Sequence, residues 1–407
     1  MIEYYIWIIA FITIYVSIFW ISIMFIENTE NAELKKYPLV SLIIPVLNEE
    51  KSIKNTVDSL LNLNYPKNKF EVIIVDDGST DNTKEIVGSY KDKRVRLILN
   101  EHKGIGKASA LNNGILNAKG EIVGCVDADC YVNTDSLMNM IGHFKSDEVG
   151  AVITSVKVLN PRSFFEKMQR IEYILTSFIR RLMSYVGTLQ VTPGALSLYK
   201  KSVIDKVGYF DENNLTEDYE IALRLINNHY RVVMESSIDT YTYVPENMKD
   251  LWTQRVRWFR GFILNNLKYK HMFMNRKYGL SGTFQTPINF FSLFVVFASL
   301  ILLGYQVFKW VYHFITRLLI LEWDIFNLLK FPTIKELILN INLKIAFPVV
   351  VAFLFGLYIY YKAHQYTKEK IRFPIAIFIY LFIYPFLRTA QWLTALAAET
   401  FNLRRKW

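Results

Sequence analysis

The chain has 407 residues, of which 52% are hydrophobic and 15% aromatic, and its formal net charge is +10. A chain of this length holds one sizeable domain plus further elements, because single cores stop growing at about 250–300 residues. The positive mean hydropathy argues against a wholly water-soluble protein. The positive charge does not indicate nucleic-acid binding, because the lysines and arginines gather beside apolar segments and match no recognised nucleic-acid-binding motif.

Residues 4–26 are the first predicted element, and they contain no charged side chain. A helix of this length spans roughly 34 Å at about 1.5 Å per residue, which is enough to cross the hydrocarbon core of a bilayer. A secretory signal would begin with cations and end a shorter apolar core at a small-residue cleavage site. Because the segment has none of these features, residues 1–31 predict a retained N-terminal transmembrane helix.

Residues 32–246 alternate between strand-like and helix-like stretches. Ile53, Val57 and Leu60 recur at helical spacing, and a second helix is expected at residues 107–117. The predicted strands are residues 40–45, 70–75, 94–99 and 121–126. Strands that alternate with helices imply a parallel sheet with helices on both faces, and such sheets bind ligands at the carboxyl ends of their strands.

Acidic residues follow three of these strands, in PVLNEE, DDGSTDNT and DADC. Asp127 and Asp129 are two residues apart, so a loop can direct both carboxylates at one divalent cation, or at a cation and a ribose. For Asp76 and Asp77 the alternative is turn and helix-cap chemistry, because Asp, Gly and Ser favour turns and N-caps. Lys107 stands at the start of a predicted helix, where an anion can bind, although the preceding glycines do not have the spacing of a phosphate loop.

Residues 164–186 place apolar side chains at every third or fourth position, with arginines between them. This pattern is typical of an amphipathic helix on a membrane surface, and a core helix of a soluble domain is the alternative. Residues 251–277 carry seven lysines and arginines and no acidic residue, and residues 362–372 are also basic. By the positive-inside rule both segments belong in the cytoplasm, and the two cysteines fit a reducing compartment.

The C-terminal part of the chain is strongly apolar. Residues 287–308, 345–361 and 373–398 predict about three crossings. Residues 311–330 are either interfacial or a further crossing. The chain is thus expected to be a multi-pass protein of the cell membrane with a cytoplasmic α/β domain.

Five short motifs occur in order between residues 40 and 261: IIPVLNEE, VDDGSTD, VDAD, LTEDYEIALRL and QRVRW. Together they resemble the membrane-integrated branch of glycosyltransferase family 2, which includes cellulose, hyaluronan and poly-N-acetylglucosamine synthases and some glycolipid enzymes. The resemblance implies an α/β domain with the A-type, Rossmann-like glycosyltransferase fold, set in an α-helical transmembrane bundle with interfacial helices. It also implies a nucleotide-sugar donor, expected to be a UDP-sugar, and Mg²⁺ or Mn²⁺ as cofactor.

The same resemblance implies a domain organisation. Residues 1–31 would form the N-terminal transmembrane helix, and residues 32–246 the cytosolic glycosyltransferase domain, with an amphipathic interfacial helix near 161–187. Residues 247–286 would form interfacial helices that carry the QxxRW motif, and residues 287–407 a C-terminal transmembrane bundle.

The roles known for the family pass to the matching positions of this chain. Asp218 of TED would be the general base, and Asp129 of VDAD would hold the metal against the diphosphate. Trp258 would stack on the acceptor sugar, with Glu217 also on the acceptor side, and an interfacial anchor is the alternative for Trp258 because tryptophan is enriched at membrane surfaces. The donor-binding residues would be Glu49, Asp76, Asp77, Lys107, Asp127, Gln254 and Arg257.

One base without a second catalytic carboxylate predicts direct displacement with inversion, so that an α-linked donor yields a β-linked product. The leading hypothesis is a processive transferase that extends a β-linked polysaccharide and secretes it. A single transfer to a membrane lipid is the alternative, and a third hypothesis is a transporter or scaffold with an inactive sugar-binding domain. The expected partners are a nucleotide sugar, a glycan or lipid acceptor and membrane lipids, without nucleic acid.

Overall fold

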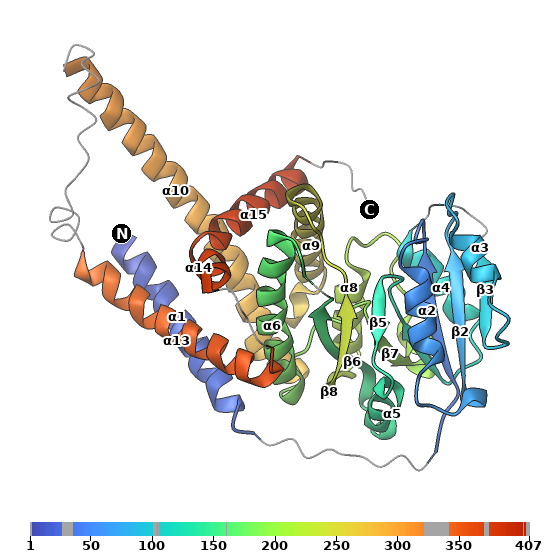
Figure 1. The fold of residues 1–407 in the computed structure, drawn as a ribbon. Helices are drawn as coiled ribbons and strands as arrows, with labels where there is room; N and C mark the ends of the chain where they lie inside the picture. Colours follow the sequence, from blue (N-terminus) through green and yellow to red (C-terminus); the bar gives the residue numbers. More distant parts are fainter. Residues whose placement is uncertain are drawn as a thin grey trace. The chain divides into compact units, whose positions relative to one another are not determined.

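The computed structural model describes residues 2–26, 36–100, 104, 106–159, 161–320, 342–369, 374–401 and 403. The chain divides into two compact units. The helical unit comprises Met1–Phe25 and Ile288–Lys362, and the sheet unit comprises Ile26–Pro287 and Ala363–Trp407. Figure 1 labels most of the helices and strands of both units.

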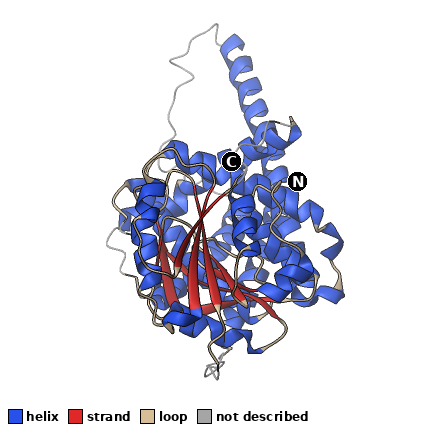
Figure 2. Ribbon diagram, turned by 90° about the vertical axis from the view of Figure 1, so that its right-hand side faces the viewer, coloured by secondary structure: helices blue, strands red, loops and turns tan. Residues whose placement is uncertain are grey.

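The sheet unit is built on eight strands in the order β3-β2-β1-β4-β7-β6-β8-β5. They form one twisted sheet, which Figure 2 shows in red. The strands are β1 (Val40–Val46), β2 (Phe70–Asp76), β3 (Val95–Leu99), β4 (Ile122–Cys125), β5 (Cys130–Val132), β6 (Val149–Val158), β7 (Ser197–Lys200) and β8 (Arg231–Thr242).

One half of the sheet agrees with the sequence, and the other half does not. Strands β3, β2, β1 and β4 pair in parallel, as the alternation of strands and helices predicted. In the other half, β7 is antiparallel to both β4 and β6, and β5 is antiparallel to β8, while β6 and β8 are parallel. The sheet is therefore mixed, whereas the alternation of strands and helices implied a parallel one. Strands β5 and β7 are only three and four residues long. They are too short to show a hydrophobic period, so pairing with distant strands sets their direction.

Strand β1 contributes to a hydrophobic core on each face of the sheet, because successive side chains of a strand point in opposite directions. Leu42 and Ile44 pack in one cluster with α2 (Ile53–Leu61), while Ile43 packs in the other with α4 (Lys107–Leu116). These three side chains have no exposed surface, and burying each contributes about 1.5–3 kcal/mol. The two cores hold α2 and α4 on opposite faces, as the predicted layers require.

Helix α6 (Phe164–Tyr185) confirms the helix predicted at residues 164–186. A capping box begins it, because the Ser163 hydroxyl accepts a hydrogen bond from Glu166 N at 3.1 Å and Ser163 N donates to the Glu166 carboxylate at 2.5 Å. The helix packs against β6 and β8, so it is part of the packing of the sheet unit. Its expected position at a membrane surface stays a prediction.

The QRVRW motif lies within α9 (Met248–Lys268), which packs beside a helix from the end of the chain. That helix is α15 (Tyr384–Thr400), and the rings of Phe259 and Trp392 stack between the two helices with their centroids 4.2 Å apart. The remaining α-helices of the sheet unit are α3 (Thr83–Gly88), α5 (Ser136–Ile141), α7 (Lys201–Val207), α8 (Glu217–Asn227) and α14 (Pro374–Phe382). The C-terminal residues thus pack on the helix that carries the motif.

Three described helices are long and apolar enough to cross a membrane, at Glu3–Ile23, Ser281–Ile320 and Leu343–Thr367. They correspond to α1 (Ile2–Ile23), α10 (Thr286–Ile320) and α13 (Leu343–Thr367). Within the helical unit, the Tyr5 hydroxyl donates to Val295 O at 3.0 Å.

The structure leaves two of the stretches that the sequence assigned to the membrane undecided. The stretch expected to cross at residues 373–398 forms α14 and α15, which have nine and 17 residues. The number of crossings therefore stays a prediction. Helix α10 covers the first part of residues 311–330, and the part beyond Ile320 lies outside the described residues.

Candidate active site

Two adjoining cavities lie at the carboxyl ends of the parallel strands, where the sequence placed the site. The first, the carboxylate cavity, has a volume of about 310 Å³, and the second, the tryptophan cavity, about 180 Å³. Lys107, Asp127 and Asp129 line both of them, so the two form one continuous crevice. The carboxylate cavity is also lined by Glu49 and Asp77, and the tryptophan cavity by Glu217, Asp218, Gln254, Arg257 and Trp258.

Asp77 connects the end of β2 with the start of α4. Its carboxylate accepts hydrogen bonds from Asn100 Nδ2 at 2.8 Å and from Gly106 N at 2.9 Å. Gly106 has a φ of +122°, a conformation that side chains rarely permit. The glycine therefore allows the first turn of α4 to approach Asp77, which sets the position of the following Lys107. Glu49, on the other side of the cavity, accepts a hydrogen bond from Ser52 Oγ at 2.7 Å.

Asp76 takes the role of a turn residue, which the sequence left open. It is 2% exposed, and its carboxylate accepts from Gly78 N and from Ser79 N, both at 3.1 Å. Lys84 Nζ lies 3.4 Å from the same carboxylate. Asp76 does not line either cavity in the described part of the chain, so its contact with a donor stays a prediction.

Lys107 joins the two cavities electrostatically. Its Nζ lies 2.5 Å from Asp127 Oδ1 and 3.3 Å from Glu217 Oε1. Burial alone would lower the pKa of the ammonium group, but Asp127, Glu217 and Asp218 hold it well above its ordinary value. Lys107 is therefore a cation at neutral pH, placed between the acidic residues of two motifs.

The loop at residues 191–194 was not assigned from the sequence, and it packs against both acidic motifs. Gly194 O accepts from Asp127 N at 2.7 Å, and Thr192 Oγ1 donates to Asp218 O at 2.8 Å. A Cβ added at Gly194 would lie 2.5 Å from both Asp127 Oδ1 and Lys107 Nζ. A side chain at this position would displace the ends of the Asp127 and Lys107 side chains from their present contact. The sequence signal was the TPG tripeptide before the TED motif.

Asp127 and Asp129 form the expected pair of carboxylates for a divalent cation. One ligand atom from each of them, and from Cys130, lie within 4.8 Å of one another. Burial and the neighbouring charges of Asp127 and Glu49 raise the pKa of Asp129 to about 6. Burial, Asp129 and Asp127 raise the pKa of the Cys130 thiol well above its ordinary value, which disfavours a thiolate ligand. Asp127 is paired with Lys107, and both aspartates are half-buried carboxylates whose oxygen atoms fit Mg²⁺ or Mn²⁺.

Asp218 begins the first turn of α8 with Glu217 and faces the tryptophan cavity. Burial and the charge of Glu217 raise the pKa of Asp218 to about 6, although Lys107 and Arg257 oppose this effect. A carboxylate with this pKa is ionised at neutral pH and is a better proton acceptor than an ordinary aspartate.

The QRVRW motif points three of its side chains into the tryptophan cavity. They are Gln254, Arg257 and Trp258, the positions expected from the resemblance. Arg257 Nη1 donates to Leu215 O at 2.8 Å, which holds α9 beside the loop before the TED motif. Glu217, which was expected to contact the acceptor, forms an ion pair with Lys107. Its contact with the acceptor stays a prediction.

Helix α6 supplies a wall of the tryptophan cavity that sequence reasoning missed. Glu172, Tyr173, Thr176 and Arg180 line it. Three of these positions are spaced by three and four residues, so they share one face of the helix. The sequence signal for this wall was the set of polar residues between the apolar positions of the amphipathic pattern.

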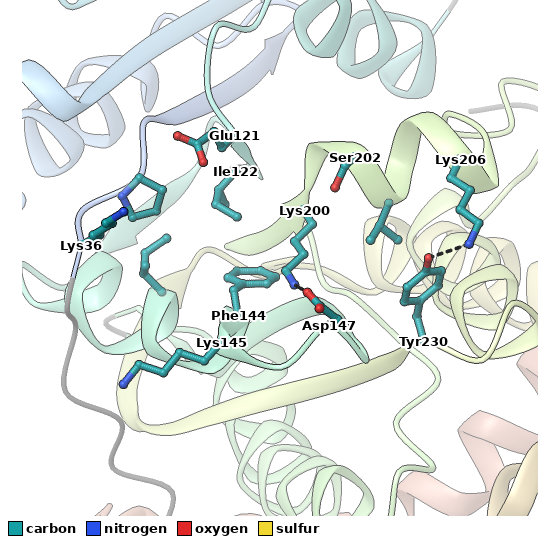
Figure 3. A pocket seen from close by; sticks show the side chains of 13 residues that line it. Lys36, Glu121, Ile122, Phe144, Lys145, Asp147, Lys200, Ser202, Lys206 and Tyr230 are labelled. Atoms are coloured by element: carbon teal, nitrogen blue, oxygen red, sulfur yellow. Dashed lines mark hydrogen bonds and ion pairs between the residues drawn. The ribbon is translucent and has the colours of Figure 1, made fainter.

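A larger cavity of about 940 Å³ lies away from the acidic motifs (Figure 3). Its lining includes Ile122, which begins β4, and Lys200, which pairs with Ile122 at the end of the antiparallel β7. It thus opens at the amino end of β4, opposite to the crevice. Lys200 Nζ lies 3.0 Å from Asp147 Oδ1, and Lys206 Nζ lies 3.2 Å from the Tyr230 hydroxyl. Among the described residues, none that the motifs assign to catalysis lines this cavity.

Comparison with known families identifies proteins to which this chain is similar. Residues 41–208 match the model of the family described as glycosyl transferase family 2. The chain is 35% identical over 264 residues to the poly-beta-1,6-N-acetyl-D-glucosamine synthase of Staphylococcus aureus strain COL. It is 34% identical over 264 residues to the enzyme of the same name from Staphylococcus epidermidis strain RP62A. Each match covers 62% of this chain and 64% of the relative.

The fold is similar to that of a solved mannosyltransferase from Pyrobaculum calidifontis, which was studied in complex with GDP-Man and Mn²⁺. The TM-score is 0.64, and the comparison covers 99% of this chain and all of the other, at 19% identity. At this level of identity the likeness shows the fold, which is the expected A-type glycosyltransferase fold.

Proposed function

We propose, from the premise that this chain carries a glycosyl transferase family 2 domain, that it transfers a sugar from a UDP-sugar with inversion. In this proposal the enzyme is processive and extends a β-linked polysaccharide that it secretes. The observation that carries the proposal is the tryptophan cavity, in which Asp218 with a raised pKa shares one space with Lys107, Asp129 and Trp258.

The donor would occupy the carboxylate cavity and extend into the tryptophan cavity. Glu49 and Asp77 line the first cavity on the side of β1 and β2, and they would contact the nucleoside. Asp127 would contact the ribose or the sugar, near the point where the cavities meet. Arg257, with Gln254 beside it, would face the diphosphate, because a guanidinium group donates two parallel hydrogen bonds to phosphate oxygens.

Asp129, with Asp127 beside it, would hold the Mg²⁺ or Mn²⁺. When bound, the cation supplies positive charge that neutralises the nucleoside diphosphate as it leaves. Lys107 adds a permanent cation to the same region, because its acidic neighbours keep it protonated. Preorganised positive charge of this kind stabilises the negative charge that develops in the transition state.

Asp218 would act as the general base. The acceptor hydroxyl gives its proton to the Asp218 carboxylate while its oxygen forms a bond to the anomeric carbon of the donor sugar. The bond from that carbon to the phosphate oxygen breaks, and its electron pair leaves with UDP. The displacement inverts the anomeric centre, so an α-linked donor gives a β-linked product.

The relatives favour N-acetylglucosamine as the transferred sugar, because they are poly-beta-1,6-N-acetyl-D-glucosamine synthases. We therefore take UDP-N-acetylglucosamine as the first donor to test. Trp258 lines the cavity beside Asp218, and the face of its indole ring would support the apolar face of the acceptor sugar. The three apolar helices would anchor the enzyme in the cell membrane, with the basic residues 251–277 and the catalytic domain in the cytoplasm.

The test is to incubate the purified protein, held in a nanodisc, with a panel of labelled UDP-sugars and Mg²⁺ or Mn²⁺, and to measure product size. A long polymer from one donor is expected, and the Asp218→Asn variant is the matched inactive control. Products that carry only one added sugar at saturating donor would overturn processivity. A discrete, lipid-extractable product would identify the single-transfer alternative.

A further inference from the structure

Arg255 lies at a variable place of the QxxRW motif, yet it is the largest fully buried side chain among the described residues and is only 1% exposed. Its Nη2 donates to Glu172 Oε2 at 2.8 Å, and its Nη1 donates to Gln254 Oε1 at 2.7 Å. The centre of its guanidinium group lies 4.1 Å from the centroid of the Trp258 ring. One buried cation therefore contacts three residues that line the tryptophan cavity.

Glu172 is the anionic partner of Arg255, and contacts from α15 hold it in place. It belongs to α6 and is 9% exposed, and the Tyr384 hydroxyl of α15 donates to its Oε2 at 2.9 Å. Arg388 Nη1 lies 3.8 Å from its second oxygen. Burial would raise the pKa of Glu172, but Arg255, Arg388 and the Tyr384 hydroxyl bring it below its ordinary value. Glu172 is thus a permanently ionised anchor, unlike Asp218, and it is not suited to accept the acceptor's proton.

We propose that the Glu172–Arg255 pair is a positioning unit for Trp258, held in place from α15 by Tyr384. The inference deepens the proposed function, on which it rests, because it names what orients the residue that supports the acceptor sugar. The guanidinium group covers one face of the indole ring, and a cation over this face is attracted to the ring quadrupole. In this proposal the opposite face of the ring would support the sugar.

The geometry explains why this position needs arginine rather than lysine. The planar guanidinium group donates to Glu172 and Gln254 from two different nitrogens while its flat face meets the ring. A lysine ammonium group would keep the charge, but it could not make both hydrogen bonds while a flat face stacks on the ring. Arg255→Lys is therefore the conservative change that separates the presence of a charge from the orientation of Trp258.

The first experiment measures orientation without activity. The full-length protein is labelled with 5-fluorotryptophan, and the fluorine resonance of Trp258 is assigned by its loss in Trp258→Phe. We expect Arg255→Lys to shift the Trp258 resonance while the resonance of Trp252, on the same helix, stays unchanged. An unchanged Trp258 resonance in Arg255→Lys would overturn the proposal.

The second experiment uses a variant that is designed to fold. Removing one partner of a buried ion pair leaves an uncompensated charge, whereas replacing both partners is often neutral for stability. Glu172→Gln combined with Arg255→Met removes both charges and keeps a hydrogen-bond acceptor for Tyr384. The matched control combines Arg170→Met with Glu369→Gln, which removes the ion pair between α6 and a residue outside the cavity.

Kinetics are measured with UDP-N-acetylglucosamine and a short β-linked N-acetylglucosamine oligosaccharide as acceptor. In the double variant we expect the acceptor KM to rise by about tenfold or more, while the Kd for UDP changes by less than about threefold. In a Trp258→Ala background the same pair of changes should add no further effect on the acceptor KM, because both act through one side chain. The control variant should match the wild type.

An acceptor KM equal to that of the wild type in the folded double variant, or an effect that simply adds to that of Trp258→Ala, would overturn the positioning role. Failure of the proposed function has a different signature, because the wild type would then make no product from any UDP-sugar. In that case the fluorine resonance of Trp258 still decides whether the pair positions the ring.

Discussion

Lys107 and Glu217 are far apart in the sequence, yet Lys107 Nζ lies 3.3 Å from Glu217 Oε1. This ion pair joins the first turn of α4 to the first turn of α8, which carries Asp218. The same ammonium group lies 2.5 Å from Asp127 Oδ1. One lysine therefore links the acidic residues of two motifs in the crevice.

Asp218→Asn should reduce turnover by roughly 10²–10⁴-fold, because an amide cannot accept the proton of the acceptor hydroxyl. The amide has nearly the same shape as the carboxylate, and UDP binding should persist, since the residues of the carboxylate cavity are unchanged. Single-turnover rates and isothermal titration with UDP measure the two effects separately. If UDP binding disappears together with turnover, Asp218 has a role in donor binding and not the assigned role of base.

The pH dependence of kcat should show a limb on the acid side near pH 6. Burial and Glu217 raise the pKa of Asp218 to about 6, and the base must be ionised to accept a proton. Turnover should therefore fall as the pH decreases through about 6, and it should be flat between pH 7 and 8 if no other group titrates. The profile is measured at saturating metal and donor, because Asp129 also has a pKa of about 6. A limb near pH 4 would contradict the raised pKa.

Asp129→Asn should stabilise the metal-free protein at neutral pH. The pKa of Asp129 is about 6 in the folded chain, against an ordinary value of 3.8, so the folded state favours the protonated acid. The wild type loses this stability as the pH rises from about 4 through about 6, and the asparagine variant does not. In EDTA, the Tm of the variant should exceed that of the wild type at pH 7.5 but not at pH 4.

The same pair of proteins tests the metal site. Added Mn²⁺ should raise the Tm of the wild type, because an ion that binds only the folded state stabilises it. It should have little effect on Asp129→Asn. An equal increase in both proteins would place the cation elsewhere.

Gly194→Ala should weaken donor binding by at least about tenfold and change the free energy of unfolding by less than about 1 kcal/mol, because the ends of two flexible side chains can move aside. The added methyl group would meet the carboxylate of Asp127 and the ammonium group of Lys107, each at about 2.5 Å or less. Gly88→Ala is the matched control, because no heavy atom lies within 4 Å of a Cβ at that position. Isothermal titration with UDP and thermal unfolding measure the two effects. Wild-type UDP binding in Gly194→Ala would show that the loop at residues 191–194 does not constrain the ion pair.

The sequence was sufficient to predict those features that depend on residues close together in the chain. The short apolar run at residues 40–45 predicted β1, and the spacing of Ile53, Val57 and Leu60 predicted α2, whose burial the structure shows. The acidic motifs after the strands predicted the crevice, because parallel strands bring their carboxyl ends to one edge of the sheet. Asp77, Asp127 and Asp129 all line it.

The sequence did not predict features that arise when distant segments meet. The mixed half of the sheet depends on pairs between distant strands, such as Gly124 of β4 with Leu198 of the four-residue β7. Gly194 lies against the ion pair of Asp127 and Lys107, which the sequence does not place beside it. The role of α6 as a cavity wall likewise depends on tertiary contacts.

By itself, the sequence determined the elements of the nucleotide side, the family resemblance and the apolar helices, because each is encoded in a short run of residues with its own periodicity or spacing. Only the tertiary structure decided which charged groups face one another. Arg255 occupies a variable place in its motif, and its contacts with Glu172 of α6 and Trp258 of α9 exist because two helices pack together. Charge pairing and burial depend on distances in space, which no local pattern contains.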